Sequence, residues 1–429
     1  SESKLSQEDG AQYLYDLYKK SDIEKIDAAN PEDKNVSVKG SENKDLDIKT
    51  YSDIFPYEWD KIESRLLSLS ARVKNDVQEK KLPAYYEAYG SLLEKTANVY
   101  GSKVITPEIL DKEWEDLYDI AKSVYDSDCP LMIIPQGCTS VAGEAGKIDA
   151  EIRLGLKTKE TKQQEQGLNK FTQIAQEMLS VYDVGLDKSR PVPKVNLNYQ
   201  PWAFGPNLYW QTRGESGESQ ILSHTNAVSE VAIAKELPLV EKVFDRKNIS
   251  DEQYARASVV ETVLHETGHC VIEYTDKKVA KRIGKSFEVD ILEELKAESI
   301  GMKILAEAMK RGELPTEIDI KAQLLAKLGA NLDYLKNKSS EKASSGEPYY
   351  ICGVAIISNL LDKRLIVKNN STYEISDPEA CIKEIASLSD EILPFYTNDE
   401  TKPADVKNYI KKLRNRGQEP LIKDFIKDL

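Results

Sequence analysis

The chain has 429 residues, with 59 lysines and arginines against 73 aspartates and glutamates, so its formal net charge is −14. This acidic balance argues against nucleic acid or an anionic membrane surface as the main partner. No apolar run approaches the roughly 20 residues of a membrane span, and no apolar segment of a signal peptide is present. The composition is typical of a globular protein with a core.

The residue patterns predict a helix-dominated α+β protein with a small sheet near its centre. Apolar residues recur at helical spacing from Pro56 to residue 99, and Pro107 opens a further helix at its first turn. A polar helix is expected over 159–182, and the chain becomes helical again from residue 226, with a hairpin over 364–375. Short segments bounded by glycine and proline predict strands at 131–135, 147–156, 192–199 and 207–212.

Three parts are expected along the chain. Residues 1–50 form a polar N-terminal segment, because they include a long charged and polar stretch that could not bury a core. Residues 51–190 form a helical region with short strands, and residues 191–429 carry the candidate metal ligands. One continuous domain over 51–429 remains an alternative.

Five cysteines occur without a CxxC pair, which excludes a zinc ribbon or a thioredoxin-like site. Cys129 and Cys138 could pair in an oxidising compartment, whereas a reducing compartment would keep both as thiols. We favour the reducing, cytoplasmic alternative, and a processed secreted or envelope protein is the other interpretation. The oligomeric state does not follow from the sequence.

Two of only three histidines lie four residues apart, since residues 265–269 read HETGH. On an α-helix, residues at this spacing lie on one face, one turn from each other. Two such imidazoles can bind one Zn²⁺ ion, and the glutamate between them can act on a water molecule in the open position. The motif therefore predicts one zinc ion per chain, with His265 and His269 as ligands and Glu266 as general base.

A third ligand is expected downstream, on a second helix over 286–305. On this segment Glu294, Glu298 and Gly301 recur at i, i+4 and i+7, so they share one face. We expect Glu294 to bind the metal and Glu298 to accept the free ring N–H of a ligand histidine. The glycine suits a helix that is pressed against the helix of the two histidines, where a larger side chain would clash.

Two other carboxylates compete with Glu294 for the metal. Glu288 lies further upstream, and Glu293 is adjacent and is placed among the carboxylates that support the ligands. We favour Glu294 because only Glu294 has a second acid one turn later with small residues around it. Without the histidine motif upstream, the same acidic row would indicate the solvated face of a surface helix.

The pair of motifs resembles that of glutamate-liganded zinc peptidases, and the second motif is most similar to that of the dipeptidyl peptidase III family. The family motif reads EECRAE, and residues 293–298 here read EELKAE. The apolar segment 349–361 is also similar to a later helix of that family. The resemblance implies a zincin-like metallopeptidase fold with a helical zinc-binding region, and a peptide substrate.

Two features differ from the family pattern. The family has one more residue between its histidines, HExxGH, and its later catalytic histidine is absent here, where Tyr349 and Tyr350 occupy that region. We therefore treat His224, Tyr349 and Tyr350 as candidates for the donor that polarises the scissile carbonyl. The family's asparagine-bearing substrate strand implies three candidates for peptide binding: Asn196, Asn198 and Arg213.

The predicted function is a zinc-dependent metallopeptidase in which Glu266 takes a proton from water and hands it to the leaving amine. Release of dipeptides is implied by the resemblance alone. The alternative is a zinc- or peptide-binding protein that keeps the fold with weak or no activity. The intact Glu266 argues against this alternative, because a binding protein has no need of a general base.

Overall fold

The computed structural model describes residues 56–100, 116–117, 119–124, 127, 129–136, 151–182, 192–204, 214–216, 220–246, 248–272 and 277–429. The chain divides into two compact units. Of the described residues, the first unit holds those up to Thr161 together with 198–204, and the second holds Lys162–Leu197 and the residues from 214 onward. This division into compact units does not test the domain boundary that the sequence predicts near residue 190, so that boundary stays a prediction.

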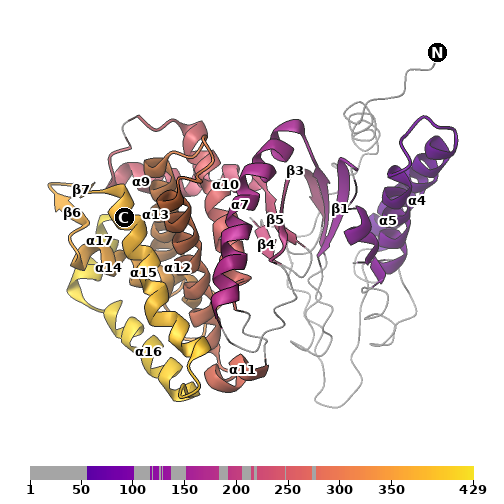
Figure 1. Ribbon diagram of the computed structural model, residues 1–429. Coiled ribbons are helices and arrows are strands. Elements are labelled where there is room, and N and C mark those ends of the chain that lie inside the picture. The colour runs from indigo at the N-terminus through magenta and orange to yellow at the C-terminus, as the bar shows by residue number, and fades with distance from the viewer. Residues whose placement is uncertain are drawn as a thin grey trace. The chain divides into compact units, whose positions relative to one another are not determined.

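In the first unit, two helices pack against each other, namely α4 (Pro56–Gln78) and α5 (Tyr86–Tyr100) (Figure 1). The predicted helical spacing is confirmed, because it places one apolar row of each helix in the interface. The buried side chains of this interface include Leu66, Val73, Tyr89, Leu92 and Leu93. The Ser70 hydroxyl donates a hydrogen bond of 2.7 Å to the Gly90 carbonyl across it.

The predicted strands at 131–135, 147–156 and 192–199 are confirmed as β1 (Leu131–Gln136), β2 (Glu151–Leu156) and β3 (Lys194–Phe204). In the first unit β1 and β2 are antiparallel, with Leu131 opposite Leu156, and β2 is antiparallel to the last part of β3. In the second unit β4 (Gly214–Ser216) and β5 (Gln220–His224) are antiparallel. The strand order is β1-β2-β3-β5-β4. The predicted strand at 207–212 lies outside the described residues.

The second unit is built mainly from helices. Its first part contains α7 (Lys159–Val181) from Lys162 onward, α8 (Thr225–Val231), the π-helix η1 (Ala232–Glu236) and α9 (Leu237–Val243). Its central helices are α10 (Asp251–His269), α11 (Lys277–Ile283), α12 (Phe287–Arg311), α13 (Ile320–Asn337) and α14 (Glu347–Asp362). It ends with the hairpin β6 (Ile366–Asn369) and β7 (Thr372–Ile375), followed by α15 (Pro378–Thr397), α16 (Pro403–Arg416) and α17 (Pro420–Asp428). The polar helix and the hairpin expected from the sequence are thus confirmed.

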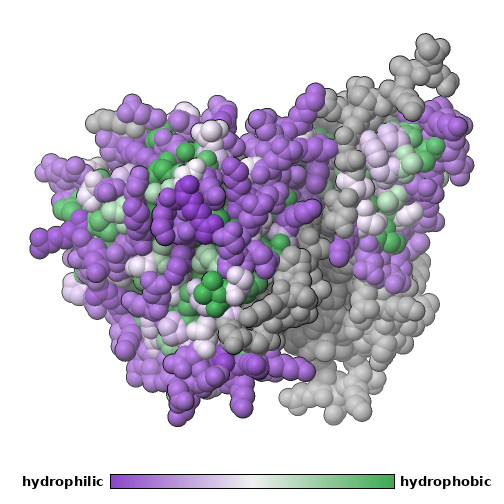
Figure 2. All heavy atoms as spheres, viewed as in Figure 1, coloured by the Kyte–Doolittle hydropathy of each residue, from purple (hydrophilic) through white to green (hydrophobic). Residues whose placement is uncertain are grey.

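Helix α12 lies among α10, α14 and α15, and α13 packs on both α10 and α14 (Figure 1). One apolar core runs through this group of helices, and its members include Leu264, Leu292, Leu295, Leu328 and Ile356. The outward face of the unit is mainly hydrophilic, with small separate apolar areas (Figure 2). Among the described helices, none combines the length and the apolar character that crossing a membrane requires.

Local signals in the sequence begin and end the two central helices. Ser250 and Gln253 form a reciprocal capping box at the start of α10. Ser286 occupies the N-cap position of α12, and Gly312 ends that helix in the left-handed conformation, with φ of 67°. Both helices therefore run without interruption through the residues that carry the two sequence motifs.

The two central helices approach each other at glycines. A β-carbon on Gly301 of α12 would lie 2.8 Å from the Leu264 carbonyl oxygen of α10. A β-carbon on Gly268 of α10 would collide with the Ala297 carbonyl oxygen of α12. The predicted role of Gly301 is confirmed, because only a residue without a β-carbon allows the two backbones to come this close.

Candidate metal centre

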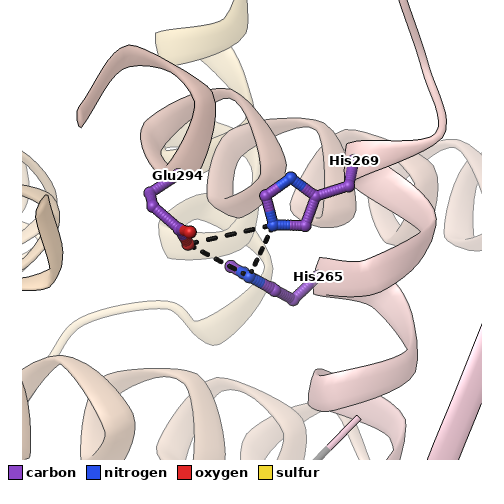
Figure 3. A group of neighbouring side chains, drawn as sticks. All are labelled: His265, His269 and Glu294. Carbon is purple, nitrogen blue, oxygen red and sulfur yellow. Dashed lines mark hydrogen bonds and ion pairs between the residues drawn. The ribbon is translucent and has the colours of Figure 1, made fainter. Parts of the chain in front are cut away.

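Helices α10 and α12 bring three predicted ligands together. His265 and His269 lie one turn apart near the end of α10, and Glu294 lies on α12. Figure 3 shows the two imidazole rings and the carboxylate pointing toward one another. One ligand atom from each residue lies within 4.8 Å of the other two, so the three side chains could hold one metal ion.

The distances between the donor atoms suit a zinc ion. The two Nε2 atoms are 3.1 Å apart, and Glu294 Oε2 lies 3.4 Å from Nε2 of His265 and 3.8 Å from Nε2 of His269. Bonds of about 2.0–2.1 Å in a tetrahedral zinc site put neighbouring donor atoms about 3.3 Å apart. Glu294 Oε2 is buried and accepts no hydrogen bond from the described residues, which suits an atom that binds a cation.

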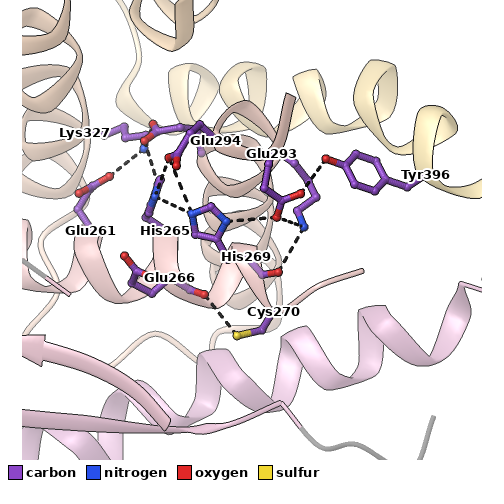
Figure 4. Close-up of polar contacts among 11 residues, drawn as sticks. Glu261, His265, Glu266, His269, Cys270, Glu293, Glu294, Lys327 and Tyr396 are labelled. Carbon is purple, nitrogen blue, oxygen red and sulfur yellow. Dashed lines mark hydrogen bonds and ion pairs between the residues drawn. The ribbon is translucent and has the colours of Figure 1, made fainter. Parts of the chain in front are cut away.

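Two carboxylates orient the imidazole rings. Glu298 Oε1 lies 3.0 Å from Nδ1 of His265, as the sequence predicted, and Glu293 Oε1 lies 3.3 Å from Nδ1 of His269 (Figure 4). An ionised carboxylate can only accept a hydrogen bond, so each Nδ1 must be the donor. Both Nε2 atoms are then directed toward Glu294, and this is the arrangement that a bound metal requires.

The charges of the cluster favour a cation between the two rings. Burial alone would lower the pKa of His265, but the carboxylates of Glu294 and Glu298 outweigh burial and raise the pKa well above its ordinary value. Burial would raise the pKa of Glu293, but Lys296 and His269 lower it to about 2. Glu293 thus stays ionised near neutral pH, and the neighbouring carboxylates stabilise a positive charge on the His265 ring.

Four side chains around this cluster were not predicted from the sequence. Lys327 of α13 forms ion pairs with Glu298 and Glu261, and Lys296 of α12 forms one with Glu293 (Figure 4). The Tyr396 hydroxyl donates a hydrogen bond of 2.9 Å to Glu293 Oε2. For Lys327 the sequence did contain a signal. This lysine interrupts an apolar helical stretch, and a lysine on a buried helix face needs an ionic partner.

Glu266 lies between the two histidines on α10 and is partly exposed. Tyr349, on the first turn of α14, lies within electrostatic reach of this carboxylate. The charge of Glu294, burial and the charge of Glu266 all raise the pKa of the Tyr349 hydroxyl. The ring of Tyr349 lies 5.2 Å from that of Tyr334, centroid to centroid, and 5.5 Å from Nζ of Lys338. Its role at the centre stays a prediction. Tyr350 has a pKa raised by burial and packs close to Gly417 of the C-terminal helices.

The other predicted site residues lie on strands β3 and β5 or outside the described part of the chain. His224 is the last residue of β5, and its side chain is fully buried. Asn196 and Asn198 lie two residues apart on β3 and are also buried. Arg213 lies outside the described residues. The roles of His224, Asn196 and Asn198 stay predictions.

The alternative ligand Glu288 is engaged by another group. Its Oε1 atom forms an ion pair of 3.0 Å with Arg414 of α16. The same guanidinium donates a hydrogen bond of 2.6 Å from Nε to Glu347 at the start of α14. Among the described residues, Glu288 is thus not part of the cluster that could hold a metal ion, and Glu294 takes that position.

The arrangement was compared with known proteins. No protein-family model and no curated protein matches this sequence. A structure of dipeptidyl peptidase III from Caldithrix abyssi matches with a TM-score of 0.64 and 15% identity, over 96% of this chain and 76% of that one. A structure of dipeptidyl-peptidase III from Corallococcus sp. strain EGB matches with a TM-score of 0.56 and 15% identity, over 94% and 74%. The resemblance predicted from the two motifs is confirmed for the fold: this chain has the helix-dominated fold of these dipeptidyl peptidase III structures.

Proposed function

We propose that the protein is a zinc-dependent metallopeptidase. The observation that carries this proposal is the convergence of His265, His269 and Glu294, with one donor atom of each within 4.8 Å of the others. Three protein ligands with an open fourth position are typical of catalytic zinc sites, whereas structural sites use four. The likeness in fold to dipeptidyl peptidase III structures supports the same activity.

The protein residues around such a zinc ion have distinct roles. A bound zinc ion would supply a Lewis acid that activates water at neutral pH. Glu266 accepts the proton of that water and donates it to the amine that leaves. Glu293 and Glu298 hold the two imidazole rings so that their Nε2 atoms stay directed at the ion.

Tyr349 is our candidate for the donor to the oxygen of the scissile carbonyl. The charge of Glu294, burial and the charge of Glu266 raise the pKa of its hydroxyl, so it stays protonated and able to donate. Such a donor acts where negative charge develops in the transition state. Tyr349 would thus serve where the related family has a histidine on the corresponding helix.

The proposed substrates are peptides. The similar structures are named as dipeptidyl peptidase III, so removal of dipeptides from the amino end is the specificity we propose to test first. The zinc-loaded protein is incubated with a mixed peptide library, and the products are identified by mass spectrometry. We expect dipeptide release. Cleavage at internal peptide bonds would contradict dipeptide release and identify an endopeptidase.

The Glu266→Gln variant tests the mechanism. It should bind zinc as tightly as the wild type and lose cleavage, because the amide cannot accept the proton. Glu252→Gln is the matched control, since Glu252 lies on the same helix but is exposed and pairs with Arg256. A wild type that binds zinc and cleaves nothing would contradict the proposal and favour a zinc- or peptide-binding protein.

A further inference from the structure

A buried series of ionic contacts links His265 of α10 to Glu298 of α12, Lys327 of α13 and, back on α10, Glu261. Nδ1 of His265 meets Oε1 of Glu298, and Oε2 of Glu298 forms an ion pair with Nζ of Lys327. The same Nζ lies 2.8 Å from Oε1 of Glu261 on α10. Lys327 and Glu298 are each 1% exposed, and Glu261 is 6% exposed. These contacts therefore connect α10, α12 and α13 away from water.

Burial explains why a lysine is needed at this point. A carboxylate without a partner costs several kcal/mol when it is removed from water, so Glu298 could not remain in place as an ion by itself. Its two oxygens have different partners: Oε1 accepts a hydrogen bond from the His265 imidazole, and Oε2 forms the ion pair with the ammonium group of Lys327. Lys327 thus compensates the charge of the residue that orients the ligand.

The same arrangement occurs at the second ligand. Nδ1 of His269 meets Oε1 of Glu293, which lies 2.6 Å from Nζ of Lys296, a side chain that is fully buried. Each ligand imidazole therefore contacts a carboxylate, and that carboxylate forms an ion pair with a buried lysine. Because the two lysines come from different helices, α13 and α12, the repetition does not follow from one helical spacing.

We propose that Lys327 is a positioning residue of the metal centre: it compensates and holds Glu298, which in turn holds the His265 ring with Nε2 toward the metal. The proposal rests on the proposed function only in requiring that the centre binds zinc. Lys327 touches neither the metal position nor substrate, so its effect passes through Glu298. Removing Lys327 should therefore weaken zinc binding, and the loss should depend on the presence of Glu298.

Zinc affinity, measured by competition with a chelator, tests this with a double-mutant cycle. Lys327→Met should weaken zinc binding by about 10–100-fold, the range found when partners of metal ligands are removed. In a Glu298→Gln background, the same change should weaken it by less than about 3-fold, since the charge it compensates is gone. Lys303→Met is the matched control, because Lys303 lies on α12 but pairs with Asp390 of α15. Its zinc affinity should equal that of the wild type.

A second variant keeps the test decisive if Lys327→Met does not fold. Lys327→Gln keeps hydrogen-bond donors but is one atom shorter and lacks the charge, and it should also bind zinc more weakly. The visible spectrum of the cobalt-loaded variant should differ from that of the wild type, because the ligand geometry relaxes. Wild-type zinc affinity in a Lys327 variant, or an equal loss with and without Glu298, would overturn the proposal.

The two proposals fail in different ways. A wild type that binds zinc but cleaves no peptide contradicts the peptidase and leaves the role of Lys327 supported if the cycle shows coupling. A wild type that binds no zinc overturns both. Unfolding of the metal-free variants is followed in parallel, so that a loss of stability with unchanged zinc affinity identifies a purely structural lysine and rejects the proposal.

Discussion

Gly301 of α12 lies against the backbone of Leu264 on α10, where a β-carbon would be 2.8 Å from the Leu264 carbonyl oxygen. Leu264 immediately precedes the first ligand histidine, and Gly301 follows Glu298 by three residues on the helix that carries Glu294. The contact therefore sets the distance between the two helices at the metal centre. A change of one methyl group here acts on stability and on the ligand geometry together.

Gly301→Ala should destabilise the protein by about 1–3 kcal/mol, because the added methyl group overpacks a backbone contact that cannot relax cheaply. Urea unfolding of the metal-free protein measures this change. Gly167→Ala on α7 is the control, since a β-carbon there would meet its nearest atom at 3.4 Å. That substitution should be neutral or stabilise by about 0.5–1 kcal/mol, as alanine favours helix. Equal changes in the free energy of unfolding for Gly301→Ala and Gly167→Ala would show that the helix contact at Gly301 is not overpacked by a methyl group.

Glu294→Ala should lower zinc affinity by more than about 100-fold, since it removes a ligand and not merely a partner of a ligand. Glu288→Ala should leave zinc affinity unchanged, because Glu288 is bound to Arg414. Competition with a chelator measures both. If Glu288→Ala removes the metal and Glu294→Ala does not, the third ligand has been assigned to the wrong residue.

Tyr349→Phe should lower kcat by about 10²–10³ with little change in KM, because a donor to the transition-state oxygen is lost. Tyr350→Phe is the matched control on the next residue, whose pKa is raised by burial. It should retain activity. Steady-state rates on a cleaved peptide distinguish the two, and the reverse order of effects would assign the role to Tyr350.

Arg414→Met should destabilise the metal-free protein by about 3–5 kcal/mol near neutral pH, since it leaves Glu347, which is 1% exposed, without its guanidinium partner. Arg416→Met, which breaks ion pairs at a more exposed site, should cost less than about 1 kcal/mol. Urea unfolding measures both variants. Equal losses would contradict the difference in burial.

The cost of Arg414→Met should also depend on pH. Burial would raise the pKa of Glu288, but the hydrogen bond from Arg414 outweighs it and lowers the pKa below 4.5. A carboxyl with a lowered folded-state pKa stabilises the protein above its unfolded value, and this stability is lost as the pH falls through the folded value. The difference between wild type and variant should therefore shrink as the pH falls below 4.5.

Most of the helices could be predicted from the sequence because their signals are local. The apolar spacing of α4 and α5, the polar helix α7, the strands β1 to β3 and the hairpin β6–β7 agree with the structure within a few residues. The spacing of the two histidines likewise depends only on the pitch of one helix. The expected strand at 207–212 and Arg213 lie outside the described residues, so they stay predictions.

The sequence by itself determined which side chains could bind a metal, because HETGH and EELKAE each present their ligands on one helical face. It also indicated the close approach of the two helices, through Gly301. Only the tertiary structure decided which groups surround those ligands. Lys327 comes from a helix far along the chain, and its ion pair with Glu298 depends on how α13 packs against α10. No local pattern says which residue of a distant helix will meet a given ligand, whereas the spacing that brings two side chains onto one face of a helix is visible within five consecutive residues.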